Sequence, residues 1–137
     1  PFISGLYNPV ESEEAKQFPS LQKYNHCGIV DLKCLHFMQR QYDPESRHSR
    51  DPLAWPVWAR EEDLAGLPPF AISLNEADVL YDEGLTFYRK LRAAGVRVTG
   101  RTVLGTCHAA DFLAVLAAPD IYKALLYDLK AFVDGLQ

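Results

Sequence analysis

A strand, a helix and a second strand are predicted in succession between residues 70 and 104, and this order constrains the fold more than any other feature. Residues 70–74 are almost continuously apolar, which is typical of a strand buried on both faces of a parallel sheet. The amphipathic segment 82–94 starts with acidic residues and ends with basic ones, as a helix dipole favours. Residues 96–104 then predict the next strand. Together these segments predict a βαβ unit with parallel strands and a right-handed crossover.

Two further amphipathic helices are predicted, one over residues 28–42 and one over residues 120–133, and the second should dock on the sheet. Turn-forming residues dominate the rest of the first half, with a short helix expected near residues 11–17. Two strands cannot build a complete three-layer α/β sheet. We therefore expect one partial domain over residues 1–137, with a loop and helix region at 1–66 and a strand-helix-strand-helix region at 67–137.

Composition and charge exclude several classes of protein. Of the 137 residues 48% are hydrophobic, which argues against disorder, and the formal net charge of −4 argues against a nucleic-acid partner. No run approaches the roughly 18 apolar residues of a membrane span. The three cysteines form no C-x-x-C pair, so neither a disulfide framework nor a zinc site is predicted. A reducing, cytoplasmic compartment is the expected location.

Polar residues follow both predicted strands of the βαβ unit. Residues 75–78 include the carboxylates of Glu76 and Asp78, and residues 105–108 end with His108. The carboxyl ends of parallel strands meet at one edge of the sheet, where functional groups gather. A carboxylate there can orient an imidazole so that its other nitrogen accepts a proton from a nucleophile. A histidine after a strand is also often an ordinary solvated loop residue, so spacing alone leaves both interpretations open.

The segment GLPPFAISLNEADVLYDEG at residues 66–84 resembles the GLPP-strand-E-x-D-x-L-x-DEG signature of hormone-sensitive-lipase-like carboxylesterases in the α/β-hydrolase superfamily. Residues 88–96 and 105–111 resemble the helix end and the histidine loop that follow it in the family. Residues 1–5 and 43–56 resemble the parts that precede it in brefeldin A esterase-like members. The resemblance covers essentially the whole chain. It implies the carboxyl-terminal half of an α/β-hydrolase three-layer sandwich, a mostly parallel sheet flanked by helices.

Carried over position by position, the resemblance makes Asp78 the catalytic acid and His108 the catalytic base, in the chain order of these hydrolases. Glu76 is the local competitor for the acid role. Asp82 and Glu83 match the DEG motif, and their expected role is structural. The chain departs from the family pattern at two places, where Val79 replaces a common proline and residues 109–110 are Ala-Ala in place of a common Gly-Phe. The first should loosen the turn that holds Asp78, and the second should change the pocket wall.

The family's nucleophile and oxyanion loop are absent from this sequence. The six serines, at positions 4, 12, 20, 46, 49 and 73, all lack the G-x-S-x-G context, and no Gly-Gly pair occurs. Ser4, which precedes Gly5, comes closest to the G-x-S-x-G pattern. The resemblance therefore implies hydrolysis of a small-molecule carboxylic ester only together with a missing amino-terminal half that bears the serine. It implies no metal or organic cofactor.

Two other interpretations remain at this point. The chain could be an inactive hydrolase remnant kept as a binding or dimerisation module, since the last strand and the carboxyl-terminal helix often form a homodimer surface in the family. It could also be an unrelated α/β domain in which Asp78 and His108 fall at strand ends by chance. Cys107 is a weaker candidate nucleophile, and Trp55 and Trp58 either line a pocket or anchor a loop.

Overall fold

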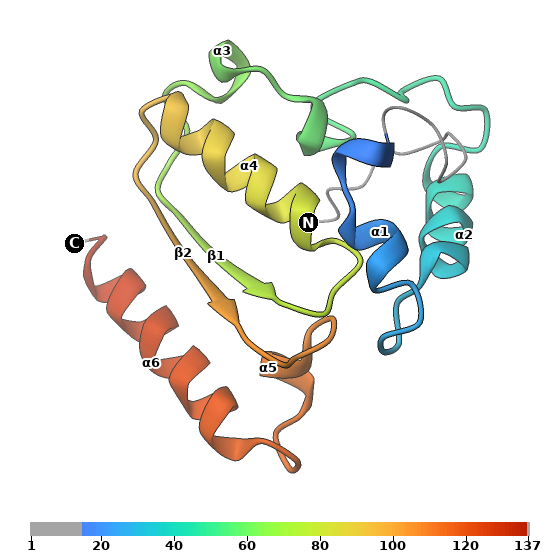
Figure 1. Ribbon diagram of the computed structural model, residues 1–137. Coiled ribbons are helices and arrows are strands. Elements are labelled where there is room, and N and C mark those ends of the chain that lie inside the picture. Colours follow the sequence, from blue (N-terminus) through green and yellow to red (C-terminus); the bar gives the residue numbers. More distant parts are fainter. Residues whose placement is uncertain (1–14, 137) are drawn as a thin grey trace.

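The predicted βαβ unit forms the centre of the computed structural model, which describes residues 15–136 (Figure 1). Strands β1 (Phe70–Asn75) and β2 (Val98–Val103) pair in parallel, with Phe70 opposite Val98 and Asn75 opposite Val103. Helix α4 (Tyr81–Ala93) connects them and ends before Gly95, whose φ of 75° is a left-handed conformation that glycine adopts without strain. The α/β fold class is therefore confirmed.

Helix α4 packs closely on one face of the sheet. Phe70 and Ile72 of β1 contact a cluster that includes Phe87 and Leu91 of the helix, and the rings of Phe70 and Phe87 meet edge to face at 6.1 Å. A Cβ at Gly84 would lie 2.6 Å from Cδ2 of Leu74. The glycine of the D-E-G motif is thus explained by the close approach of α4 to β1.

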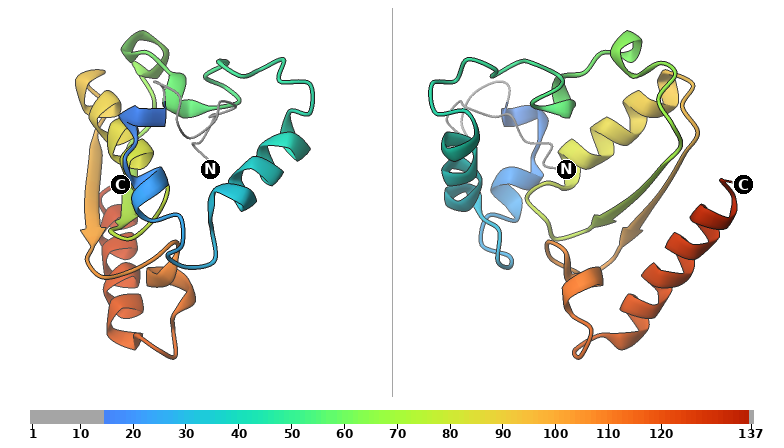
Figure 2. Two further views of the ribbon diagram at one scale, coloured as in Figure 1. Left: turned by 45° about the vertical axis from the view of Figure 1, so that its right-hand side comes forward. Right: turned by 180° about the vertical axis from the view of Figure 1, so that it is seen from behind.

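The other face of β1 is open, contrary to the prediction of a strand buried on both faces. Ala71 and Ser73 are exposed there. Helix α6 (Pro119–Asp134) lies on this side, so the sheet stands between α4 and α6 (Figure 1 and Figure 2). A hollow of about 440 Å³ separates α6 from the sheet, which explains the exposure of the small residues of β1.

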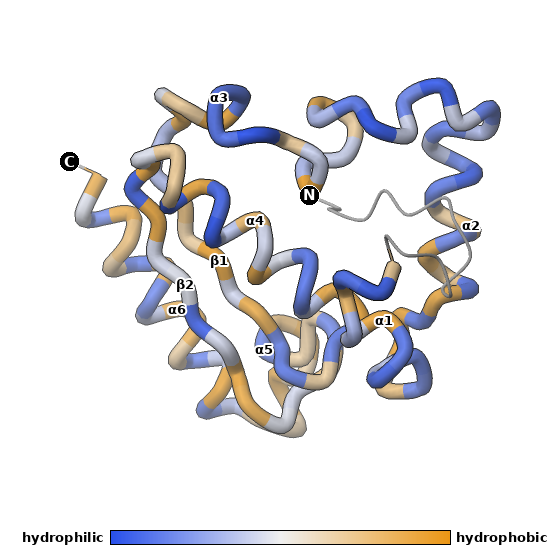
Figure 3. The backbone as a smooth tube through the Cα atoms, turned by 45° about the horizontal axis from the view of Figure 1, so that its top comes forward, coloured by the Kyte–Doolittle hydropathy of each residue, from blue (hydrophilic) through white to orange (hydrophobic). Residues whose placement is uncertain are grey.

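Helix α6 is held at the sheet mainly by polar contacts. Asp128 accepts a 2.7 Å hydrogen bond from Arg101 of β2, and Arg97 donates to the carbonyl of Gly135 at 2.9 Å. Apolar and polar residues alternate along the helix (Figure 3), yet Leu125 is its only buried residue. The helix therefore keeps an exposed apolar side. No helix within residues 15–136 is long and apolar enough to span a membrane.

Within residues 15–66 there is one longer helix, α2 (Leu32–Tyr42), which begins four residues later than predicted. Gly28 has a φ of 100°, which no helix accommodates, and the side chain of Asp31 caps the helix by accepting a hydrogen bond from the Cys34 amide at 2.8 Å. The remaining elements are short: η1 (Ala15–Gln17), α1 (Ser20–Lys23), η2 (Pro56–Trp58), α3 (Glu61–Leu64) and α5 (Ala110–Leu113). Of the helix expected near residues 11–17, only η1 falls within the described residues.

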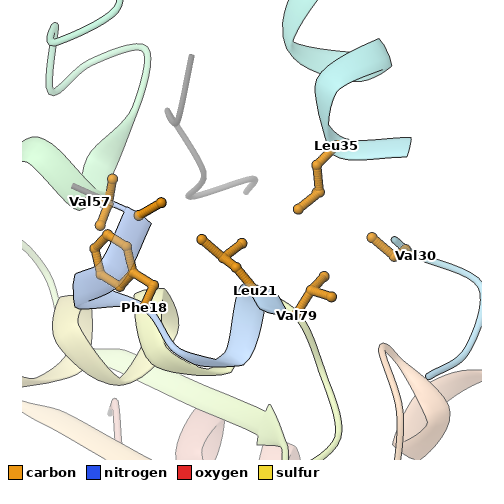
Figure 4. Close-up of a cluster of buried hydrophobic side chains, with 7 residues drawn as sticks. Phe18, Leu21, Val30, Leu35, Val57 and Val79 are labelled. Carbon is orange, nitrogen blue, oxygen red and sulfur yellow. The ribbon is translucent and has the colours of Figure 1, made fainter. Parts of the chain in front are cut away.

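A hydrophobic cluster joins these segments to the turn after β1. Val79 of that turn is fully buried, and Leu21 of α1 and Leu35 of α2 point toward it (Figure 4). The same cluster contains Phe18, Val30 and Val57 (Figure 4). Burying side chains of this size stabilises the fold by about 1.5–3 kcal/mol each. The turn that carries Asp78 is thus packed against three segments that precede it in the chain.

Ser20 adds a polar connection between α1 and the same turn. Its hydroxyl donates to the carbonyl of Val79 at 2.8 Å and accepts from the amide of Asp82 at 3.1 Å. The carboxylate of Asp82 accepts in return from the Ser20 amide at 2.7 Å. Asp82 therefore has the structural role that was expected of it, because it ties the start of α4 to α1.

We expect Ser20→Ala to lower the free energy of unfolding by about 1–3 kcal/mol, because the buried Val79 carbonyl and Asp82 amide would lose their partner. Urea unfolding followed by circular dichroism measures the difference. Ser46→Ala, at an exposed serine, is the matched control and should change stability by less than about 0.5 kcal/mol. Equal effects of the two substitutions would contradict the role of Ser20.

Candidate active site

Asp78 and His108 meet at the carboxyl edge of the sheet. Oδ2 of Asp78 lies 2.8 Å from Nδ1 of His108, within hydrogen-bond distance. The Asp78 side chain is 10% exposed and that of His108 is 25% exposed, so the acid is the more deeply buried of the two. Backbone pairing continues past the strands to hold both loops, since the Ala77 amide donates to the Thr106 carbonyl at 2.8 Å. The parallel register thus brings the two predicted residues together.

The contact fixes which nitrogen of His108 carries the proton. An ionised carboxylate only accepts hydrogen bonds, so Nδ1 must donate to Asp78 and Nε2 of the neutral ring keeps a free lone pair. Oδ1 of Asp78 accepts from the Leu80 amide at 3.0 Å, and the Tyr81 amide donates to the Asp78 carbonyl at 3.1 Å. These bonds hold the acid in a tight turn without a proline at position 79. The arrangement leaves Nε2 of His108 ready to accept a proton.

The surroundings of His108 favour its charged form. The hydrogen bond to Asp78 raises the pKa of the imidazole above its ordinary value of 6.5, and partial burial opposes this. The negative charges of Asp78 and Asp111 raise the pKa further. His108 therefore binds its proton more tightly in the folded chain than in the unfolded one.

This raised pKa predicts a pH-dependent contribution to stability. The contribution is fully present below the unfolded pKa and is lost as the pH rises through the higher folded pKa. We therefore expect the unfolding free energies of the natural chain and of His108→Gln to converge as the pH rises across that window. Urea unfolding at a series of pH values from 5 upward tests this. A difference between the two proteins that does not change with pH would refute it.

The other candidates of the sequence lie elsewhere. The carboxylate of Glu76 is exposed and accepts a 2.8 Å hydrogen bond from the Gly105 amide, while Asp78 contacts His108. Cys107 packs against Gly28: a Cβ added to Gly28 would lie 3.0 Å from Sγ of Cys107. Ser4 lies outside the described residues. Within residues 15–136 no three His, Cys, Asp or Glu side chains are grouped as a metal site would require.

Ala109, directly after the candidate base, has a left-handed conformation with φ 56° and ψ 16°. Its carbonyl accepts hydrogen bonds from the Phe112 amide at 3.0 Å and the Leu113 amide at 2.8 Å, which start α5. A residue with a Cβ is strained in this region by about 1–2 kcal/mol. The position that is commonly glycine in the resembled family is therefore one where this backbone favours glycine.

We expect Ala109→Gly to raise the free energy of unfolding by about 0.5–1 kcal/mol. Relief of the left-handed strain outweighs the greater freedom that glycine has in the unfolded chain. Chemical denaturation measures the gain, and Ala114→Gly, at a residue just after α5 whose φ is −84°, is a control that should lose stability. A loss at position 109 as large as at position 114 would show that the backbone there is not strained.

A buried polar network beneath the site was missed from the sequence. Asp111 accepts hydrogen bonds from the Ser73 hydroxyl at 2.6 Å and the Asn75 amide at 3.2 Å, and it pairs with Arg101 at 3.3 Å. Burial raises the pKa of the Asp111 carboxyl, but these three partners outweigh burial and the pKa is lowered. The polar residues at alternate positions 73 and 75 of an otherwise apolar strand were the available signal.

An apolar hollow of about 570 Å³ lies between α2 and residues 53–56. Trp55 forms part of its wall and is itself buried, and its ring meets that of Tyr42 edge to face at 5.1 Å. Trp58 instead lies under the guanidinium of Arg50, 4.6 Å from the ring centre. Of the two tryptophans, Trp55 is therefore the one that lines a hollow of ligand size.

Comparison with known proteins identifies the family. A family model described as the alpha/beta hydrolase fold matches residues 3–112, and the chain belongs to this family. The fold is similar to that of brefeldin A esterase, a bacterial homologue of human hormone-sensitive lipase, with a TM-score of 0.91 and 35% identity over 98% of this chain and 37% of that chain. The resemblance to hormone-sensitive-lipase-like esterases is confirmed, and the interpretation as an unrelated α/β domain is wrong.

Two curated relatives carry names that describe ester hydrolases. An esterase of Fusarium pseudograminearum is 30% identical over 77% of this chain and 32% of its own length. Ethyl acetate hydrolase of Pseudomonas putida is 26% identical over 82% of this chain and 34% of its own length. The chain thus spans about a third of the length of these relatives.

Proposed function

We propose that the chain supplies the acid and the base of a Ser-His-Asp triad that hydrolyses carboxylic esters. Asp78 is the acid, His108 is the base, and the serine and oxyanion donors belong to an amino-terminal half outside these 137 residues. The observation that carries the proposal is the 2.8 Å contact between Asp78 and Nδ1 of His108, which leaves Nε2 as the proton acceptor. Membership of the hydrolase family supports it.

In this mechanism the serine oxygen attacks the acyl carbon of the ester while Nε2 of His108 takes the hydroxyl proton. The imidazolium is stabilised by Asp78, and its proton passes to the leaving alcohol as the acyl-serine forms. Water then attacks the acyl-serine and gives a proton to Nε2, which passes it to the serine oxygen as the carboxylic acid product leaves. Each step is a proton transfer or an acyl transfer, so the cycle requires no metal or organic cofactor.

The substrate class is proposed from the family and not from a single pocket. The names of the Fusarium and Pseudomonas relatives describe cleavage of esters by those proteins, which supports a small-molecule ester here. We further propose a cytoplasmic location, which three free cysteines within the described residues support.

A homodimer through β2 and α6 is a separate part of the proposal. Within the described residues β2 pairs with β1 alone, so its second edge is available for another strand. Leu126, Leu129 and Val133 of α6 are exposed apolar residues near that edge of the fold. Such a surface suits a second copy of the chain.

The first test is labelling of the whole preparation with a fluorophosphonate, followed by intact-mass spectrometry under denaturing conditions. An adduct on a longer or companion chain supports the proposal. An adduct on the 137-residue chain itself refutes the claim that the serine lies elsewhere. If no serine reacts, the chain is a catalytically inactive hydrolase-like module.

We expect His108→Ala to lower kcat by roughly 10⁶-fold in the assembled enzyme, because the serine loses its base. Steady-state hydrolysis of a p-nitrophenyl ester measures the loss. His48→Ala is a matched control, since His48 lies 3.5 Å from Asp51 on the surface and repeats the pairing without the buried setting. A small effect at position 108, or an equal effect at position 48, would overturn the assignment.

A further inference from the structure

One side chain of the neighbouring strand β1 adds to the contacts of Glu76 and Ala77 that hold the loop carrying His108. Residues 104–109 form no helix or strand, so their position depends on contacts outside regular structure. The side chain of Asn75, at the end of β1, reaches this loop on both sides of the histidine. Its Oδ1 accepts a 2.7 Å hydrogen bond from the Thr106 hydroxyl, and its Nδ2 donates to Oδ1 of Asp111 at 3.2 Å.

All three members of this bridge are buried. Asn75 is 5% exposed, Asp111 is 4% exposed and Thr106 is 8% exposed. The orientation of the amide is fixed by chemistry, because the ionised Asp111 carboxylate can only accept and must face the NH₂ group. Both polar ends of the Asn75 side chain are therefore used, one two residues before His108 and the other three residues after it.

Asp111, one of the two residues that Asn75 connects, is also held by other side chains. Asp111 also accepts from the Ser73 hydroxyl at 2.6 Å and pairs with Arg101, so it cannot follow a displaced loop without breaking those bonds. Asn75 thus connects the loop to a rigid point on β1 and β2. Three partners on β1 and β2 therefore fix the position of the Asp111 carboxylate.

We propose that Asn75 is a positioning residue for the candidate base, a clamp that holds the loop on both sides of His108 so that Nδ1 faces Asp78. This inference rests on the proposed function in so far as His108 acts as a base. Within the described residues the Asn75 side chain is hydrogen-bonded to Thr106 and Asp111 and not to His108. Its role is to keep the backbone of the loop at the position where the contact between His108 and Asp78 forms.

The inference is tested on the imidazole itself, without reference to hydrolysis. In the natural chain the ¹⁵N shifts of His108 should report a ring protonated at Nδ1, and the signal is identified as the one lost in His108→Gln. In Asn75→Ala the loop loses both bonds. The ring should then return to the mixed tautomers of a free imidazole, and its pKa should fall toward the ordinary value.

An exchange of the two polar groups provides a rescue. Asn75→Asp alone places two carboxylates against each other and should release the loop. Combined with Asp111→Asn it restores one amide facing one carboxylate, and Thr106 still finds an acceptor at position 75. The double variant should recover the Nδ1-protonated ring. If Asn75→Ala does not fold, Thr106→Val is the second variant. It removes only the hydrogen bond between Thr106 and Asn75, so its effect on His108 should be smaller.

A control variant separates a change in the His108 tautomer from a general loss of stability. Ile72→Val truncates the same strand on the α4 face, away from the network, and should lower stability while leaving the tautomer of His108 unchanged. In the assembled enzyme, Asn75→Ala should lower kcat by about 10- to 100-fold with little change in KM, since a misplaced base affects the chemical step.

A folded Asn75→Ala or Thr106→Val whose His108 keeps its tautomer and pKa overturns the inference. So does a shift in Ile72→Val as large as that in Asn75→Ala, or a double variant that recovers nothing. These outcomes are distinct from failure of the proposed function, which would appear as an intact clamp in a preparation where no serine reacts with the fluorophosphonate.

Discussion

The parallel pairing of β1 with β2 is the constraint on which the rest of the structure depends. It places the two carboxyl ends at one edge, and the pairing extends past the strands to Ala77 and Thr106. Parallel strands require a crossover, which α4 supplies, and the close packing of α4 on β1 fixes where the turn bearing Asp78 begins. The contact between Asp78 and His108 is thus a consequence of strand direction and register.

The order and type of the central elements could be predicted from hydrophobic patterning: a short apolar run for β1, a helical repeat for α4 and alternation for β2. The strand ends predicted that residues 75–78 and 105–108 share one edge of the sheet, but only the family resemblance selected Asp78 over Glu76 as the partner of His108. The sequence predicts too early a start for α2 because the apolar spacing extends back to Ile29, and the capping residue Asp31 is a local signal that outweighs it. The exposure of Ala71 and Ser73 depends on what lies over the sheet, which no local pattern reports.

The clamp of Asn75 could not be predicted in the same way. Its partners Thr106 and Asp111 lie 31 and 36 residues away in the sequence, and their side chains meet only because three elements converge. Periodicity gives the face on which a residue lies, but it gives no distance between polar atoms of different elements. A polar residue at the end of an apolar strand is a weak signal that acquires meaning only with coordinates.

The proposed acid and base, Asp78 and His108, both lie in loops that follow the strands of the single βαβ unit. Their mutual geometry is therefore independent of how this unit sits against a serine-bearing part. If the serine-bearing part moved relative to the βαβ unit, the distance from the serine oxygen to the imidazole would change. The hydrogen bond to Asp78 would still keep the proton of His108 on Nδ1. With the serine on a separate polypeptide, ester cleavage would report the association of two pieces, as in a split-enzyme complementation assay.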